Sequence, residues 1–256
     1  MSSDVLSGIL TLSIVLSACS VKEDRTVCPC RLSLVFRGGT AAECYEKLHF
    51  FVEDPTVGFV NEGDAGFGEA VRLNVERTSL SVYAWAPAEC GKGYEIPVGE
   101  MCPRLFYCHG QIDARGEGVS DTLVLHKNYA ELKIILGGVD VPAREGIYAE
   151  ITSAVSGYDR EGAPIPGAFR TKQTFAESGE CSFCLPRQAD DSSELKIICP
   201  GGPEFVFPLG LFLRERGYDW AKEDLEDISL HLDYCTSTVT VVEGLWNKVV
   251  SLDVSV

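Results

Sequence analysis

The chain has 256 residues, 45% of them hydrophobic, and a formal net charge of −16 at pH 7. This length suffices for one large domain or for two domains of about 100 residues, each with its own hydrophobic core. So acidic a protein is unsuited to binding nucleic acid or to adhering electrostatically to anionic lipid, because both carry negative charge.

An uncharged apolar run from Val5 to Ala18 lies at the start of the sequence and is followed by Cys19. Its 14 residues are too few to cross a bilayer core of about 30 Å as a helix. Small residues before a cysteine are typical of a lipoprotein signal peptide, although only Asp4, and no basic residue, precedes the run. We therefore predict cleavage after Ala18 and lipid attachment, including palmitate, at Cys19. The alternative is a buried strand or helix that happens to precede a cysteine.

Lipid attachment would hold the mature protein on a membrane. Each buried methylene contributes about 0.8 kcal/mol, so two or three acyl chains bind far more firmly than one. Residues 19–27 are polar and charged, and we expect them to act as a tether between the lipid and the folded part.

From Cys30 onward, short runs of alternating apolar and polar residues are separated by Gly, Pro, Asn and Asp, which predicts an all-β protein. The residue ranges that we expect to form strands are 32–36, 48–52, 71–75, 80–86, 123–125, 132–136, 147–151, 168–175, 195–199, 204–207, 228–234 and 250–256. One helix is expected over Leu209–Arg216, with Gly217 just after its C-terminus. Three glycines, Gly63, Gly66 and Gly68, indicate a loop.

A break between Lys127 and Tyr129 divides the predicted strands into two sets. Consecutive short strands with turn residues between them favour packed sheets, so we predict two β-sandwich domains in tandem. The expected organisation is a signal peptide over 1–18, a tether over 19–27, an N-terminal sandwich over 28–127 and a C-terminal sandwich over 128–256.

Catalytic signatures are missing from the sequence: it has no G-x-S-x-G, no H-E-x-x-H, no P-loop and no G-x-G-x-x-G. The four histidines, at positions 49, 109, 126 and 231, are scattered, and we expect His49 and His231 at surface or edge positions. We predict no catalytic residue, no cofactor and no metal site, and hence no enzyme.

Ten cysteines remain after Cys19, and we expect a minority of them to be paired. Cys181 and Cys184 have C-x-x-C spacing, which allows half a zinc site, a redox pair, a disulfide or free thiols; the last two are favoured because no further ligand motif accompanies them. Acidic residues at 223, 224, 226 and 227 lack the spacing of a calcium loop, so a solvated turn is the expectation.

Three tryptophans, Trp85, Trp220 and Trp246, lie near predicted loops, where an exposed ring could stack on sugars. Aromatic side chains in β-sandwiches more often fill the core, and we favour that interpretation.

Two stretches of the sequence resemble a known family. The first is Cys19-Ser20-Val21-Lys22-Glu23-Asp24-Arg25 followed by Cys28-Pro29-Cys30, and the second is Gly217-Tyr218-Asp219-Trp220 with the acidic run after it and a closing strand after Trp246. Together they resemble the fimbrillin-associated anchor lipoproteins of Bacteroidales type V pili.

The resemblance implies two transthyretin-like, Greek-key sandwiches and attachment of Cys19 to the outer membrane, with exposure at the cell surface. It also implies a structural role as the base subunit that anchors a fimbria and limits its length. The partner would be a shaft subunit of similar β-sandwich fold, bound by strand addition at a free sheet edge. The alternative function is a surface lipoprotein that binds glycan or a host protein through loop aromatics.

Overall fold

The computed structural model describes residues 28–39, 41–137, 146–200, 204–233, 238–241 and 252–253. These residues form β-strands with one α-helix, α2 (Leu209–Glu215), and a short 3-10 turn, η3 (Ala88–Cys90). The all-β prediction is confirmed, and the helix lies where the sequence placed it. The signal peptide, Cys19 and the tether lie outside the described residues.

Seven strands form the first sandwich, with the order β3-β2-β5-β7-β8-β1-β4. Their bounds are β1 (Cys30–Gly38), β2 (Leu48–Asp54), β3 (Gly58–Ala65), β4 (Ala70–Val75), β5 (Ser79–Ala86), β7 (Phe106–Asp113) and β8 (Gly118–Lys127). Strand β8 pairs with β7 only near its C-terminal end, at His126 and Lys127, and runs parallel to β1 along most of its length. It thereby joins the layer β3-β2-β5-β7 to the layer β8-β1-β4.

The second sandwich has the sheets β11-β10-β13-β14 and β12-β9-β15-β16-β17. Their strands are β9 (Tyr129–Gly137), β10 (Tyr148–Tyr158), β11 (Pro164–Thr174), β12 (Glu180–Pro186), β13 (Glu194–Ile198), β14 (Glu204–Phe207), β15 (Ile228–Asp233), β16 (Thr238–Val241) and β17 (Leu252–Asp253). Only Asn128 separates β8 from β9, so the chain passes directly from one sandwich to the other.

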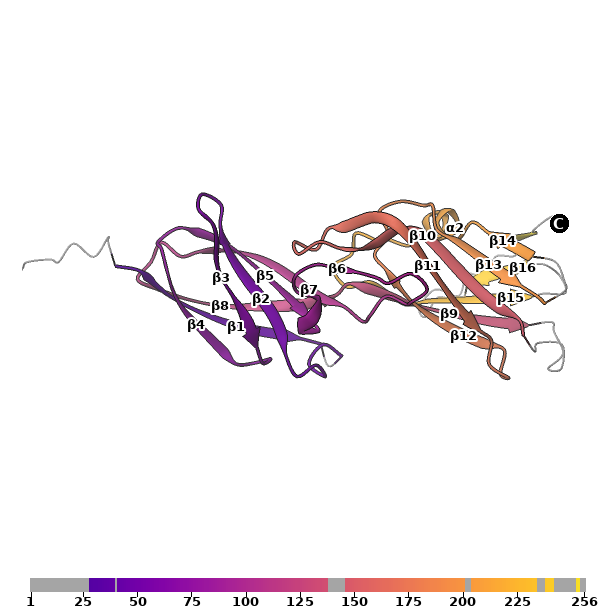
Figure 1. Ribbon diagram of the computed structural model, residues 1–256, viewed down its shortest axis with the longest axis horizontal. Coiled ribbons are helices and arrows are strands. Elements are labelled where there is room, and N and C mark those ends of the chain that lie inside the picture. Colours follow the sequence, from indigo (N-terminus) through magenta and orange to yellow (C-terminus); the bar gives the residue numbers. More distant parts are fainter. Residues whose placement is uncertain are drawn as a thin grey trace, which may run out of the picture.

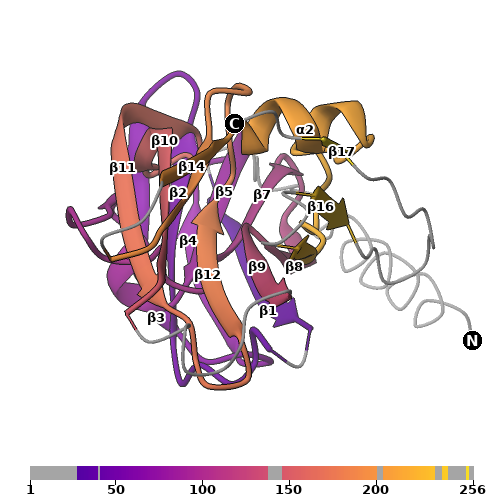
Figure 2. The ribbon, with the colours of Figure 1, turned by 90° about the vertical axis from the view of Figure 1, so that its right-hand side faces the viewer.

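The two sandwiches lie end to end (Figure 1), and a view along the long axis shows one behind the other (Figure 2). Strand β1 begins at the end of the first sandwich that faces away from the second, and runs toward the junction beside β8. The described chain therefore starts at one end of an elongated molecule.

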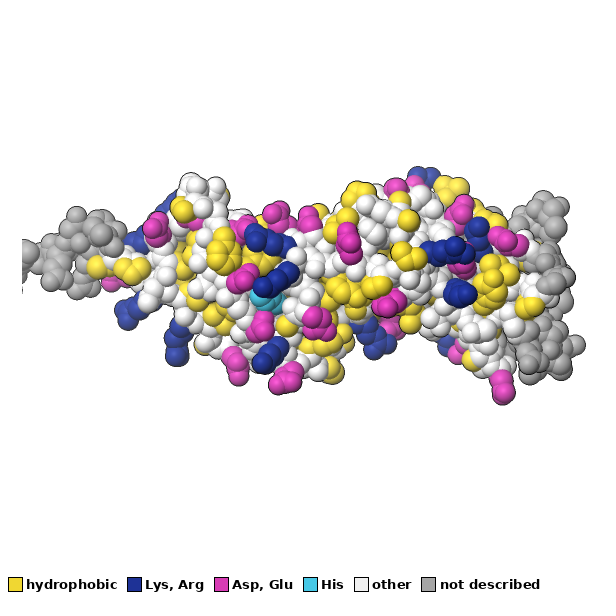
Figure 3. Space-filling view, in the orientation of Figure 1, with side chains coloured by type: hydrophobic (Ala, Val, Ile, Leu, Met, Phe, Trp, Pro, Cys, Tyr) yellow, Lys and Arg dark blue, Asp and Glu magenta, His cyan; other side chains and the backbone are white. Residues whose placement is uncertain are grey.

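The hydrophobic cores are built from every second side chain along each strand. In β1, Leu32, Leu34 and Phe36 are buried while Arg31 and Arg37 are exposed, as period-2 strands require. Strands of the second sandwich follow the same rule, with Leu132, Ile134 and Leu136 inward. The outward side chains give a surface on which acidic and basic groups are interspersed with small apolar groups (Figure 3).

The connection from β5 to β7, residues 87–105, leaves the first sandwich and packs on the second. It contributes β6 (Tyr94–Glu95), which pairs with β10 at Gly157 and Tyr158. Farther on, the Gly99 N–H donates to the Arg170 carbonyl of β11 (3.0 Å). The Cys102 N–H donates to the Cys184 carbonyl of β12 (3.1 Å). This connection therefore lies along the edge strands of both sheets of the second sandwich, β11 in one sheet and β12 in the other.

The structure corrects several expectations from the sequence. Residues 58–65 form β3, so the assignment of Gly63 to a loop was wrong. Strands β6, β7, β12 and β16 were not predicted either. The C-terminal strand expected over 250–256 is present at Leu252–Asp253, where it pairs with β16 of its own sheet; the rest of that range lies outside the described residues. The domain boundaries remain a prediction.

Gly157 allows the close approach of β6, because a Cβ at this position would lie 2.1 Å from the Tyr94 carbonyl oxygen. We expect Gly157→Ala to push the connection off β10 and to lower the free energy of unfolding by about 1–3 kcal/mol, as overpacking does. Urea unfolding and limited proteolysis within residues 87–105 measure this. Gly39→Ala is the control, since a Cβ there meets no atom within 4 Å. Equal stability of the two variants would contradict the role of Gly157.

Candidate functional site at the junction of the sandwiches

Trp85 forms the centre of the contact between the sandwiches. It is fully buried at the end of β5, and its indole N–H donates to the Arg160 carbonyl in the β10–β11 loop (2.9 Å). Its ring lies against Tyr107 and Tyr158, with centroids 4.6 and 5.8 Å away. The Tyr107 hydroxyl donates to the Glu161 carbonyl in the same loop. Aromatic rings with a polar atom at one end suit such a position, because they fill space and satisfy buried carbonyls together.

Arg187, just after β12, joins the linker to the segment before β15. Its Nε donates to Asn128 Oδ1 (2.7 Å), and its Nη atoms donate to the carbonyls of Trp220, Lys222 and Glu223. Burial lowers the pKa of the guanidinium, while it raises the pKa of the Tyr158 phenol, whose hydroxyl donates to the Asn128 carbonyl (2.7 Å). Since four of its five side-chain N–H groups donate to these partners, Arg187 acts as a structural clamp.

The acidic run after Trp220 binds the linker instead of facing only solvent. Asp224 accepts hydrogen bonds from the Lys127 N–H (2.7 Å) and, through its other oxygen, pairs with His126 Nδ1 (3.0 Å). Asp227 accepts from the Glu131 N–H (2.9 Å) and from the Lys127 ammonium (2.5 Å). Between them Leu225 is buried. The expectation of a solvated turn was therefore incomplete: these carboxylates position the peptide between β8 and β9.

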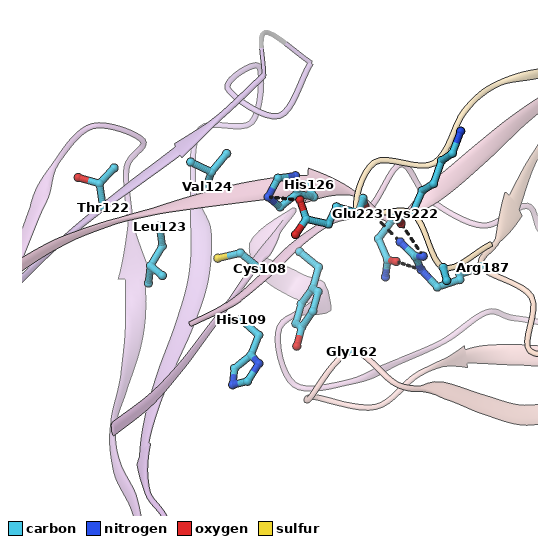
Figure 4. A pocket seen from close by; sticks show the side chains of 13 residues that line it. Cys108, His109, Thr122, Leu123, Val124, His126, Gly162, Arg187, Lys222 and Glu223 are labelled. Carbon is cyan, nitrogen blue, oxygen red and sulfur yellow. Dashed lines mark hydrogen bonds and ion pairs between the residues drawn. The ribbon is translucent and has the colours of Figure 1, made fainter. Parts of the chain in front are cut away.

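A hollow of about 420 Å³ opens beside this network, and both sandwiches contribute to its walls (Figure 4). His109, Leu123 and His126 come from the first sandwich, and Arg187 and Glu223 come from the second. Cys108 and His126 both line this hollow, and His126 pairs with Asp224, so the residue types that nucleophilic catalysis needs are present. However, burial raises the pKa of Cys108 to about 12, so its thiol stays protonated and is a poor nucleophile at neutral pH.

The C-x-x-C pair lies within β12, where alternate side chains face opposite sides of the sheet. Cys181 is buried in the core and Cys184 faces the other way, toward the connection from the first sandwich. The strand therefore excludes a bond between them and a shared metal. Within the described residues no cluster of three His, Cys, Asp or Glu side chains is arranged to hold a metal ion.

Other residues singled out in the sequence are distributed over the molecule. His49 is buried and its Nδ1 pairs with Asp64 Oδ1 (2.8 Å), so the expectation of a surface position was wrong. His231 is exposed, as expected. Trp220 is half-buried against Tyr218, and Trp246 lies outside the described residues. No helix among the described segments is long and apolar enough to span a membrane.

A free sheet edge is the second candidate for function. Among the described strands, β14 has a hydrogen-bonded neighbour, β13, on one side only. Val206 on β14 is 46% exposed, and Leu211 on the adjacent helix α2 is 38% exposed. The opposite side of the sandwich is bordered by the connection of residues 87–105, so among the described residues β14 is the edge of its sheet that is open to an incoming strand.

Replacing Asp224 tests the clamp on the linker. Burial raises the pKa of this carboxyl, but hydrogen bonds from the Lys127 N–H and from His126 outweigh that effect and lower the pKa below its ordinary value. Its stabilising contribution is therefore present at neutral pH and is lost as the pH falls through the lowered pKa. We expect Asp224→Asn to destabilise the protein at pH 7 by up to about 1 kcal/mol, a value limited by solvent exposure.

The measurement is urea unfolding between pH 7 and pH 3, in which the difference between Asp224→Asn and the natural sequence shrinks below about pH 4. The matched control is Glu223→Gln, which removes a neighbouring carboxylate that is largely exposed. Its Oε2 lies 3.9 Å from His126 Nε2, farther than Asp224 Oδ2 does from His126 Nδ1. A difference that persisted unchanged at pH 3 would contradict the argument.

No family model and no curated protein matches this sequence. Solved structures do match. The fimbrial anchor protein Mfa2 from Porphyromonas gingivalis is 13% identical over 84% of this chain and 96% of its own, with a TM-score of 0.61. A candidate adhesin from Bacteroides thetaiotaomicron is 14% identical over 84% and 96% of the two chains, with a TM-score of 0.62.

A candidate polysaccharide-binding protein from the same Bacteroides species is 12% identical over 83% of this chain and 95% of its own, with a TM-score of 0.63. Identities this low establish similarity of fold. The chain therefore shares the fold of a fimbrial anchor protein over nearly the whole length of that protein, which confirms, at the level of fold, the resemblance seen in the sequence.

Proposed function

We propose that this protein is a lipid-anchored outer-membrane subunit that holds the base of a fimbria on the cell and limits its length. The observation that carries the proposal is the fold shared with Mfa2, which covers 84% of this chain and 96% of that protein. The elongated shape and the extensive junction suit a part that transmits a load between two attachment points.

The geometry gives the subunit an orientation. Strand β1 begins at the end of the molecule remote from the second sandwich, and Cys19 lies only nine residues before Cys28. A lipid at Cys19 would therefore place the first sandwich next to the membrane and direct the second outward. The second sandwich is then the part that meets the fimbrial shaft.

The β14 edge is the place where we expect the shaft subunit to bind. An extended segment of a partner adds to a sheet edge through main-chain hydrogen bonds, and its alternating side chains enter pockets beside that edge. The exposed apolar residues Val206 and Leu211 would supply such contacts on the outward sandwich.

The alternative, glycan binding through loop aromatics, has less support. Trp85 is fully buried between the sandwiches, and Trp220 is half-buried against Tyr218. Neither presents the flat, solvent-facing ring that stacking on a sugar requires.

The lipid anchor is tested by Cys19→Ala. We expect cells with this variant to shed intact or elongated fimbriae into the medium, because the base subunit is no longer held by acyl chains. The measurement is the ratio of cell-bound to released fimbriae, combined with radiolabelled palmitate incorporation. Cys28→Ala is the control, since this cysteine is exposed and lies beyond the predicted cleavage site. Unchanged retention in Cys19→Ala would refute the anchor role.

The docking edge is tested by Val206→Lys. A charge at a 46% exposed position on β14 costs the fold little, but it would be desolvated by an added strand, so we expect at least a tenfold loss of affinity for the purified shaft subunit. The control is Val57→Lys, a 73% exposed position on the β2–β3 hairpin of the first sandwich. Equal affinity of both variants for the shaft subunit would show that the shaft subunit does not bind at β14.

A further inference from the structure

The connection of residues 87–105 brings a cysteine of its own against β12. Cys102 is buried, and its N–H donates to the Cys184 carbonyl (3.1 Å). In a hydrogen-bonded pair of residues on neighbouring extended segments the two Cα atoms lie about 5.5 Å apart. A disulfide spans about 4.4–6.8 Å between Cα atoms, so this kind of backbone pairing is compatible with one.

The sulfur atoms of Cys102 and Cys184 both lie near the carbonyl oxygen of Pro103. Cys102 Sγ lies 3.3 Å from the Pro103 carbonyl oxygen, and Cys184 Sγ lies 3.7 Å from the same oxygen. The two thiols are also within hydrogen-bonding reach of each other. In this structure both are thiols.

We propose that Cys102 and Cys184 form a disulfide that fastens the connection from the first sandwich to β12 of the second. The bond would enclose residues 103–183, including the linker at Asn128, so the sandwiches would be joined covalently at two places. The Cys184 side chain is half-buried and is the one more open to an oxidant, while Cys102 is deeply buried.

The oxidant is a disulfide of the exported compartment, such as that of a thiol–disulfide oxidoreductase. The Cys184 thiolate attacks one sulfur of that disulfide, forms a mixed disulfide and releases one thiol. The Cys102 thiolate then attacks the Cys184 sulfur and releases the second thiol. Two protons and two electrons leave the protein, and the oxidant is reduced to a dithiol. The supply of this oxidant in cells depends on the proposed surface location. The positions of the two sulfur atoms do not depend on that proposal.

The test uses the full chain in a buffer of oxidised and reduced glutathione, followed by alkylation without reduction, trypsin digestion and mass spectrometry. Cleavage after Lys and Arg gives peptides 93–104 and 173–187, which contain Cys102 and the Cys181–Cys184 pair. We expect these peptides to be linked, with Cys181 alkylated, and to separate on reduction. Recovery of both peptides unlinked, or linkage of Cys102 to Cys90, would overturn the proposal.

Matched variants locate the bond. Cys181→Ser, on the core face of the same strand, should keep the linkage, whereas Cys184→Ser should abolish it. Reduction should lower the midpoint of thermal unfolding of the natural sequence by about 5–10 °C and leave that of Cys102→Ser unchanged. An equal shift in Cys102→Ser would also overturn the proposal. Because oxidation is done in a defined buffer, failure here is distinct from failure of the Cys19→Ala shedding assay.

Discussion

The arrangement of the two sandwiches depends on the burial of Trp85 between them. Its ring fills the space between Tyr107 of the first sandwich and Tyr158 of the second, and its N–H satisfies a carbonyl of the β10–β11 loop. A linker of one residue would otherwise leave two sheets free to pivot. Three features lie at this junction: the aromatic contact of Trp85, the pairing of β6 with β10, and the hydrogen bonds of Arg187. These tertiary contacts hold the two sandwiches end to end.

This junction also explains the asymmetry of the second sandwich. The segment of residues 87–105 borders β11 and β12, and therefore occupies the side on which a partner strand could otherwise add. Among the described residues of the second sandwich, the β14 side keeps an edge strand with an exposed apolar residue, Val206. A protein that must accept a neighbour at one place, and avoid self-association elsewhere, benefits from such one-sided protection.

The sequence predicted those parts of the structure in which local pattern and burial coincide. Strand β1, with Leu32, Leu34 and Phe36 inward, is an example, and helix α2 before Gly217 is another. Strand β7 was missed because Cys108 and Gly110 stand at inward or half-buried positions and hide the alternation. Strand β3 was missed because it is an edge strand of mostly exposed or half-buried residues, in which Phe59 and Val60 are consecutive and no alternation appears. The contacts of the junction join residues far apart in the chain, such as Trp85 with Arg160, and no local pattern encodes them.

The central claim, that this subunit sits at the base of a fimbria, is tested most directly by locating it on intact cells with gold-labelled antibody under the electron microscope. The account predicts label only where a fibre meets the cell, at the same position on short and long fibres. Label along the shaft, at fibre tips, or mainly on membrane without fibres would contradict it.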